Sequence, residues 1–436
     1  MEERRIATLC VLALSVSGAL HAGVPGSAHT ESAHLESHVE SVRAAPYPRS
    51  KLITGIRWDF AGAKGLRKAD GSDLWPCTWA FDDALYCAWG DGGGFQGTDG
   101  IGRVSLGFAR VTGTPHAGDP SSFQGNNLWG APPYAERRAT FGGKVGSLIA
   151  VDGVIYGAGG LWTRENSKDP VNTWEAGTLN RLIWSYDLGK SWHIAPWAPT
   201  EDLGSYLQFG RDRANAPGGY VYDYFSRDND PTHVYLKRVT TSELARAPER
   251  RPHWQYLESV SRSGEYVSWS PRAIDATPVF TDSQNAVGPA VVYGAGIARY
   301  FLTVGHYRSG RPQDMAAGEL GVFEGPHPWG PWRTVYYGDD WGRFPAWSHG
   351  DYLGLTFPAK WISDDGRTLW GVFSGLGRLD AFNVVRVRVI VSARSVLAYR
   401  PAGASRGRSP ALKRCSERFN AVNGSVFMNC GGARSW

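Results

Sequence analysis

The sequence predicts an all-β protein: a five-bladed β-propeller in a single domain, with an N-terminal signal and linker and a short basic C-terminal tail. Its 436 residues include 55 glycines and 19 tryptophans but only 3 methionines, which favours short strands and tight turns over helical bundles. Runs of β-branched and aromatic residues alternate with clusters of Gly, Asp, Asn and Pro. Five blades of about 70 residues suit this rhythm, because radial repetition leaves few exposed sheet edges.

Residues 1–22 are predicted to be a signal peptide. An apolar run from Ile6 to Leu20 follows two arginines, and Ala19 and Ala22 suit cleavage by a signal peptidase. The run is shorter than the ~20 apolar residues that span a membrane, so we expect export to a secreted or periplasmic location without stable membrane insertion. Residues 23–50 lack helical or strand periodicity and are predicted to be a disordered linker.

Residues 51–400 are predicted to form the blades. Five stretches read as hairpins around turns of Asp-Gly, Gly-Ala-Gly or Asp-rich type: 147–160, 180–197, 219–239, 290–307 and 361–375. The second contains Ser185-Tyr-Asp-Leu-Gly-Lys-Ser-Trp192, which fits the Asp-box pattern of sialidase-like propellers. Asp187 can accept turn amides there and Gly189 supplies a positive φ, so this motif indicates a structural turn and not a reactive site.

The tail, residues 401–436, carries the chain's excess positive charge. The formal net charge is +5, and the tail sets six basic residues against Glu417. The remainder is near neutral, so no nucleic-acid partner is expected. Neither metal ligands at useful spacing nor a cofactor motif is present in the sequence, and we expect no metal, no cofactor and a monomer.

Export would leave four cysteines in an oxidising compartment: Cys77, Cys87, Cys415 and Cys430. We predict a disulfide between Cys415 and Cys430, which enclose a short tail loop; the chain-entropy model gives such a bridge about 3 kcal/mol.

Cys77 and Cys87 flank a predicted turn at Asp82-Asp83. A two-residue loop there would place Cys77 opposite Ala88 and direct the two thiols to different faces. Whether they pair stays open, beside the alternative that both are small buried apolar residues.

Asp73 and Asp91 are the candidate catalytic residues. They open and close a predicted hairpin within DLWPCTWAFDDALYCAWGDGGGF, which runs from Asp73 to Phe95. Glycoside cleavage needs two carboxyl groups, one to protonate the leaving oxygen and one to attack or to activate water. Inner strands of a propeller converge on a central funnel, where acids at neighbouring strand ends can face one sugar. The glycines after Asp91 would let a substrate approach the backbone.

Aromatic residues near these acids are candidate substrate-binding groups. Trp faces stack on sugar rings and exclude water, so Trp75, Trp79 and Trp89 are predicted to wall the site. His349 is predicted to contact sugar hydroxyls, with a packing role as its alternative. Weaker candidates for a third carboxylate lie among apolar residues, where pairing with Arg or a backbone amide is the alternative: Asp223, Asp275 and Glu324.

The leading hypothesis is a glycoside hydrolase acting on a polysaccharide. A catalytically inactive carbohydrate-binding propeller is the first alternative, because it would keep the aromatic surface without needing two adjacent acids. A sialidase-like hydrolase is the second. It would need an arginine cluster and a tyrosine nucleophile, which no motif marks in this sequence.

Several segments resemble a family of bacterial five-bladed propellers, long catalogued as a domain of unknown function, that includes endo-D-arabinanases cutting mycobacterial arabinan. The resemblance covers most of residues 51–395 and includes the hairpin above, GRVSLGFARVTGTP, QFGRDRANAPGGYVYDYF, ELGVFEGPHPWGPWRTVYY and WISDDGRTLWGVFSG. It implies an arabinan-like or other furanoside-containing cell-surface glycan as substrate and endo action. It also implies a retaining double displacement with Asp91 as nucleophile and Asp73 as acid/base.

Overall fold

The structure is a computed structural model, which describes residues 45–63, 65–131, 141–163, 179–197, 204–227, 230–306, 319–338, 341, 353–375 and 380–392. The predicted signal peptide, most of the linker, the basic tail with Cys415 and Cys430, and His349 lie outside these residues. What the sequence predicts for those parts stays a prediction.

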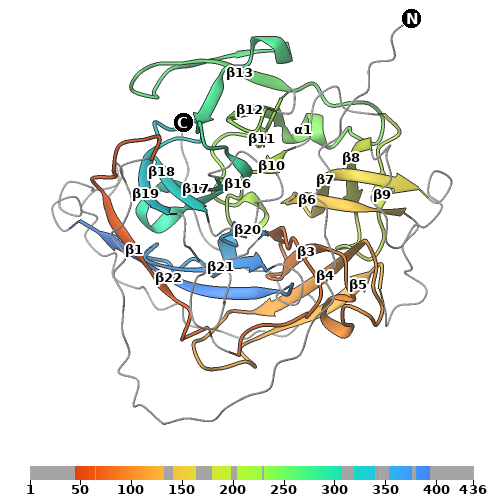
Figure 1. Ribbon diagram of the computed structural model, residues 1–436. Helices are drawn as coiled ribbons and strands as arrows, with labels where there is room; N and C mark the ends of the chain where they lie inside the picture. Colours follow the sequence, from red (N-terminus) through yellow and green to blue (C-terminus); the bar gives the residue numbers. More distant parts are fainter. Residues whose placement is uncertain are drawn as a thin grey trace, which may run out of the picture. The chain divides into compact units, whose positions relative to one another are not determined.

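Five antiparallel sheets form the blades of a β-propeller, which confirms the predicted fold class (Figure 1). In sheet order the first blade contains β2 (Cys77–Trp79), β3 (Leu85–Gly90), β4 (Leu106–Gly113) and β5 (Phe123–Trp129). The second contains β6 (Phe141–Val151), β7 (Val154–Thr163), β8 (Leu179–Ser185) and β9 (His193–Ile194). The third contains β10 (Ser205–Tyr206), β11 (Tyr220–Phe225), β12 (His233–Thr240), β13 (Gln255–Val260) and β14 (Val267–Ser270), and β15 (Pro278–Thr281) also pairs with β12. The fourth contains β16 (Val287–Gly294), β17 (Arg299–Gly305), β18 (Leu320–Gly325) and β19 (Arg333–Gly338).

The fifth blade joins the two ends of the described chain. Its strands are β20 (Leu353–Thr356), β21 (Thr368–Ser374), β22 (Asn383–Val391) and, from the other end of the sequence, β1 (Ile53–Asp59). In Figure 1 the red β1 lies beside the blue β22. Trp58 stands opposite Val387, and Asp59 forms an ion pair with Arg386 across the same two strands. The pairing of β1 with β22 therefore closes the ring within the fifth blade and covers the edge of β22.

The first strands of the blades surround a central cavity of about 530 Å³. Gln208, just after β10, joins three of these strands. Its Nε2 donates to the Leu148 carbonyl at 2.8 Å, its Oε1 accepts from the Thr78 hydroxyl at 3.0 Å, and its N–H donates to the Val291 carbonyl at 3.0 Å. Leu74, the neighbour of Asp73, belongs to the wall of this cavity. Asp73 thus directly precedes a residue of the cavity wall, although neither Asp73 nor Asp91 is among the described residues that line the cavity.

The Asp box forms the turn between β8 and β9. Asp187 Oδ1 accepts the N–H of Ser191 at 2.8 Å and of Lys190 at 3.1 Å, and φ is 82° at Gly189. The Trp192 ring stacks on Phe108 of the first blade, with 3.9 Å between ring centroids. The Asp187 carboxylate accepts hydrogen bonds from its own turn, which confirms the structural interpretation of this motif.

Cys77 and Cys87 form a disulfide between β2 and β3. The expectation that Cys77 faces Ala88 is wrong by one residue, because Trp79 pairs with Leu85 and residues 80–84 make the turn. That longer turn shifts the register so that the two cysteines stand directly opposite each other. The bridge therefore ties together the two strands from which Asp73 and Asp91 extend.

Replacing both Cys77 and Cys87 by alanine is expected to lower the free energy of unfolding by about 2 to 3 kcal/mol, because the bridge closes a loop of sequence separation 10 in the unfolded chain. Denaturant unfolding of oxidised and reduced protein and of the double variant checks this. Reduction and mutation should give the same change. An unchanged midpoint on both routes would contradict the expectation.

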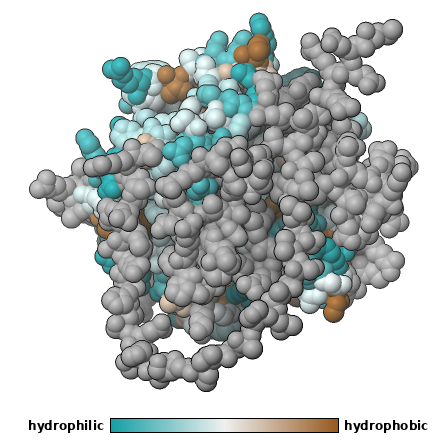
Figure 2. Space-filling model, viewed as in Figure 1, coloured by the Kyte–Doolittle hydropathy of each residue, from teal (hydrophilic) through white to brown (hydrophobic). Residues whose placement is uncertain are grey.

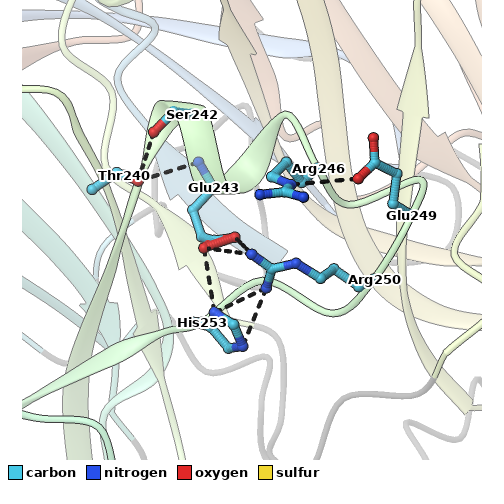
Figure 3. A network of polar contacts seen from close by, with 7 residues as sticks. All are labelled: Thr240, Ser242, Glu243, Arg246, Glu249, Arg250 and His253. Atoms are coloured by element: carbon cyan, nitrogen blue, oxygen red, sulfur yellow. Dashed lines mark hydrogen bonds and ion pairs between the residues drawn. The ribbon is translucent and has the colours of Figure 1, made fainter.

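The segment between β12 and β13 contains α1 (Thr241–Leu244), a single-turn helix held by a polar network (Figure 3). The Thr240 hydroxyl caps it by accepting the Glu243 N–H at 3.2 Å, and the Glu243 carboxylate pairs with Arg250 and lies 3.3 Å from His253 Nδ1. The remaining short turns are 3₁₀ helices: η2 (Gly94–Gln96), η4 (Arg211–Arg213), η5 (Ala273–Asp275), η6 (Ala295–Ile297) and η8 (Ala359–Trp361). None of the helices in the described ranges is long and apolar enough to cross a membrane.

Exposed large hydrophobic side chains are scattered over the described surface: Phe81, Ile101, Tyr186, Val260, Tyr266, Ile274 and Ile390. Figure 2 shows hydrophobic residues on the viewed face only as small separate spots among hydrophilic ones. Single exposed apolar residues are normal on a soluble surface, so the described part of that face gives no reason to assign a broad apolar interface.

Candidate active site

Asp73 and Asp91 lie next to each other at the open end of the first-blade hairpin. The Asp73 N–H donates to the Gly90 carbonyl at 2.8 Å, and the Gly90 N–H donates to the Asp73 carbonyl at 3.0 Å. Asp91 follows Gly90 directly. The two carboxyl groups of the predicted pair therefore project from adjoining backbone positions of one blade.

The backbone around both acids is left-handed. The φ angle is 74° at Leu74, 63° at Trp75 and 44° at Asp91, and such dihedrals cost a non-glycine residue about 1 to 3 kcal/mol each. The Ser72 hydroxyl fastens this region by accepting the Gly94 N–H at 2.9 Å. A local strain that surrounding contacts maintain is typical of functional sites.

Trp75 and Trp89 belong to the buried core of the acid-bearing hairpin. Both are 0% exposed, and their rings stack with centroids 5.8 Å apart. Each indole supports the loop, since Trp75 donates to the Ser72 carbonyl at 3.0 Å and Trp89 donates to the Gly92 carbonyl at 3.1 Å. The prediction that these rings wall a sugar site is wrong, because a sugar cannot reach a ring without exposed surface.

Trp79 lies at the opposite end of the hairpin from the acids. Its indole N–H donates to Asp83 Oδ1 at 3.0 Å within the turn, and Lys360 Nζ lies 5.6 Å from its ring centroid. The same lysine pairs with Asp83 Oδ2 at 2.8 Å. The prediction that Trp79 walls the acid site is wrong as well, since closeness in sequence did not translate into closeness in space.

Two cations contact Asp91. Lys144, from β6 of the second blade, places Nζ 2.6 Å from Asp91 Oδ1, and Arg103 places Nη2 3.5 Å from Asp91 Oδ2. The lysine side chain is 8% exposed, whereas that of Asp91 is 23% exposed. The Asp91 carboxylate is thus held from two sides while part of it stays open to solvent.

Asp73 has a different environment. The residue keeps some exposed surface, but its Oδ1 is sealed and accepts no hydrogen bond from the described residues. Burial raises the pKa of Asp73 to about 7; Lys144 opposes the rise, the Asp91 charge adds to it, and Arg103 opposes it. Near neutral pH the two neighbouring acids therefore differ, one close to half-protonated and the other ion-paired.

Gly90 brings Asp73 and Lys144 together. A Cβ atom on Gly90 would lie 2.6 Å from Asp73 Oδ1 and 2.7 Å from Lys144 Nζ, so only glycine leaves room for both groups. Combined with the 2.6 Å ion pair, these distances place Asp73 Oδ1 within about 8 Å of Asp91 Oδ1. Carboxyl pairs of glycosidases work at separations of about 5 to 9.5 Å, so the bound is compatible with that chemistry.

Asp380 is a third acid near the pair, which sequence reasoning missed. Burial raises its pKa to about 8, and the charge of Asp73 adds to the rise while a hydrogen bond from Ser374 opposes it. Its main-chain carbonyl accepts the Gly71 N–H at 2.7 Å, which ties the segment before β22 to the loop before Asp73. In the sequence, the only feature that singled out Asp380 was its position between β21 and β22. Lys144 had a comparably weak signal, a single lysine in a Gly-rich strand.

The acids named as weaker candidates have structural partners. Asp223 pairs with the fully buried Lys237 at 3.4 Å, and Glu324 pairs with Arg299 at 3.0 Å and accepts a hydrogen bond from Ser50. Asp275 accepts a hydrogen bond from Ser270 at 2.6 Å. These contacts favour the alternative that each is a satisfied packing residue.

The described site offers carboxyl and ammonium chemistry. Within the described ranges no group of three or more His, Cys, Asp or Glu side chains is placed to hold a metal ion. A buried acid near its pKa can give and take a proton at neutral pH, and a neighbouring carboxylate can act as a nucleophile or as a base toward water. Acetal cleavage is one reaction class that uses both together.

No protein-family profile matches the sequence, and no curated protein matches it. Solved structures do match. A protein of Bacteroides ovatus proposed to be a hydrolase shares 12% identity with a TM-score of 0.47, covering 82% of this chain and 97% of that one. A thermostable family-43 glycoside hydrolase shares 15% identity with a TM-score of 0.38, covering 74% and 89%. The arabinanase Arb43A of Bacillus subtilis shares 9% identity with a TM-score of 0.37, covering 74% and 95%. Similarity at this level gives no information about substrate or mechanism.

Proposed function

We propose that this protein is a secreted glycoside hydrolase that cleaves a polysaccharide, with Asp91 as nucleophile and Asp73 as acid/base of a retaining mechanism. The observation that carries the proposal is the contrast between the two adjacent acids. Asp73 is buried enough that burial raises its pKa to about 7, whereas Asp91 is held by Lys144 at 2.6 Å. In glycosidases, such a difference between the surroundings of two carboxyl groups decides which one is the acid and which one is the nucleophile.

In the first step an Asp91 carboxylate oxygen donates an electron pair to the anomeric carbon. The bond from that carbon to the glycosidic oxygen breaks, and the oxygen leaves with the proton of Asp73. The product is a glycosyl ester on Asp91 and an ionised Asp73. Protonation of the leaving oxygen and covalent capture of the sugar contribute separately to lowering the barrier.

In the second step water attacks the same carbon. Asp73 accepts the proton of the water, the ester bond to Asp91 breaks, and both acids return to their starting state. Two displacements at one carbon retain its configuration, which is the outcome that the family resemblance implies.

The proposed substrate is an arabinan-like or other furanoside-containing cell-surface glycan, attacked in endo fashion. Support for this comes from the sequence resemblance alone. The proposed location is outside the cytoplasm; the Cys77–Cys87 disulfide supports it, because disulfides persist in oxidising compartments. A monomer without nucleic-acid partners remains part of the proposal.

Incubating the purified protein with a panel of arabinan, arabinogalactan and furanoside-free polysaccharides tests the proposed function. Release of reducing ends from the furanoside-containing glycans is expected. Binding to a glycan without cleavage would favour the carbohydrate-binding propeller instead. Cleavage confined to terminal sialic acids would favour the sialidase-like hydrolase.

Gly90→Ala is expected to lower hydrolysis by about 100-fold or more, because the new methyl would lie 2.6 Å from Asp73 Oδ1 and 2.7 Å from Lys144 Nζ and must displace one of them. Gly55→Ala in β1 is the matched control, since the nearest atom to its Cβ, on Ile390, is 4.0 Å away. Initial rates at equal folded fraction decide the matter. Equal activity of the two variants would refute the tight arrangement of the acid pair.

A further inference from the structure

Lys144 is the one described group that contacts Asp91 at 2.6 Å and also borders Asp73 across the Gly90 gap. It comes from a different blade than both acids. The neighbouring strand fixes its backbone closely: a Cβ on Gly159 would lie 2.0 Å from the Lys144 carbonyl oxygen, so only glycine allows β7 to pack there. An 8% exposed ammonium group is costly to bury without a carboxylate partner, so its position needs a reason.

The proposed double displacement changes which acid carries charge. In the free enzyme the Asp91 carboxylate is the partner of Lys144. Once Asp91 is esterified it is neutral, and Asp73, having given up its proton, is the new anion. The sealed Asp73 Oδ1, which accepts no hydrogen bond from the described residues, lies on the Lys144 side of Gly90.

We propose that Lys144 is a shared counter-ion that pairs with Asp91 in the free enzyme and with Asp73 in the glycosyl-enzyme. One cation and one anion are then present in the trio at every stage, so the buried charge stays balanced through both steps. Lys144 holds Asp91 Oδ1 at 2.6 Å, whereas Arg103 lies farther from Oδ2, at 3.5 Å, so Oδ2 is the less tightly held oxygen and is assigned as the attacking atom. This inference rests on the proposed hydrolase function and makes Lys144 a positioning residue.

The charged groups around the pair come from three segments. Lys144 extends from β6, Arg103 and Asp99 belong to the loop before β4, and Asp380 precedes β22. Among them Lys144 and Arg103 oppose the raised pKa of Asp73, with Lys144 the stronger of the two. Removing the lysine should therefore raise the pKa of Asp73 further. Removing a residue with only a structural role would not have this effect.

Lys144→Met tests the inference, with Lys360→Met as the matched control, because Lys360 is likewise buried, 7% exposed, and pairs with Asp83 at 2.8 Å away from the acids. We expect kcat of Lys144→Met to fall by about 100-fold or more and the alkaline limb of its kcat/KM profile to move to higher pH. With an aryl furanoside of good leaving group, a burst followed by slow turnover is expected, since the second step needs ionised Asp73. Lys360→Met should keep the kcat and pH profile of the wild type.

Lys144→Arg keeps the charge and is expected to keep the alkaline limb in place while losing less kcat than Lys144→Met. It decides the question if Lys144→Met does not fold. A wild-type kcat and pH profile in Lys144→Met, equal losses in Lys144→Met and Lys360→Met, or a shifted limb in Lys144→Arg would overturn the shared counter-ion. A wild-type protein that cleaves no glycan would instead overturn the proposed function.

Discussion

Asp91→Asn is expected to abolish hydrolysis, with a loss in kcat/KM of at least about 10³-fold, because a neutral amide cannot form the glycosyl ester. The side chain keeps its size, and 23% of it is exposed, so the folded state should survive. Its ion pairs with Lys144 and Arg103 become hydrogen bonds at most, and the thermal midpoint should fall, because the 8% exposed Lys144 loses its carboxylate partner. Reducing-end release and a melting curve, measured on the same preparation, check both statements.

Asp70→Asn is the matched control for this variant. Asp70 lies three residues before Asp73, is 69% exposed and pairs with Arg67 at 2.8 Å, so its loss removes one surface charge from the same loop. It should retain wild-type activity. Azide added to Asp91→Ala should restore product formation as a glycosyl azide, because a small anion can enter the vacated place. Persistent hydrolysis by Asp91→Asn would contradict the assigned role.

Asp73→Asn is expected to lose about 10²- to 10⁴-fold in activity on natural glycans, which need the leaving oxygen protonated, and much less on substrates whose leaving group departs unaided. In the wild type, kcat/KM should fall as the pH rises through about 7, because burial raises the pKa of Asp73 to that value and the ionised form has no proton to give. Rates on two substrates across pH 4 to 9 measure both effects. An equal loss of activity on both kinds of substrate would contradict the acid/base role of Asp73.

The same substitution should change stability in a pH-dependent way. The pKa of Asp73 is higher in the folded state, at about 7, than in the unfolded chain, at about 4, so protonation stabilises the fold at low pH. That contribution is lost as the pH rises toward and through 7. Asp73→Asn has nothing to ionise, so its free energy of unfolding relative to the wild type should rise by about 2 to 4 kcal/mol between pH 4 and pH 8. Denaturant unfolding at the two pH values checks the sign.

Local patterns in the sequence were enough to predict the architecture and the acid-bearing hairpin. The Asp152-Gly153 turn joins β6 to β7 with φ of 50° and 83°, as expected for a tight hairpin turn with two positive dihedrals. The Asp box formed the predicted turn. These features depend on residues within a few positions of each other, which a single sequence contains.

The tryptophans show where local reading fails. Trp75 stands two residues after Asp73 and Trp89 two before Asp91, a spacing that in a regular strand puts side chains on one face. Left-handed dihedrals at Leu74, Trp75 and Asp91 break that alternation, and the rings turn into the core. The predicted pairing of Cys77 with Ala88 was wrong by one residue, because the length of the turn between β2 and β3 sets the register of the two strands.

Lys144 and Asp380 could not be predicted from the hairpin, because they arrive from the second and fifth blades. Contacts between blades depend on how the ring closes, and no spacing rule in a single sequence specifies them. Their sequence context, a lysine in a Gly-rich strand and an aspartate in a connecting loop, is common in chains that use such residues only for packing or solubility.

Mapping the covalent intermediate tests the central claim most directly. The protein would be incubated with a 2-deoxy-2-fluoro furanosyl substrate carrying a good leaving group, acid-quenched, digested and analysed by peptide mass spectrometry. A glycosyl mass increment on the peptide bearing Asp91, absent in Asp91→Asn, is predicted together with retained anomeric configuration in the product of the unmodified substrate. Hydrolysis that proceeds with inversion and leaves every Asp91 peptide unlabelled would contradict the account.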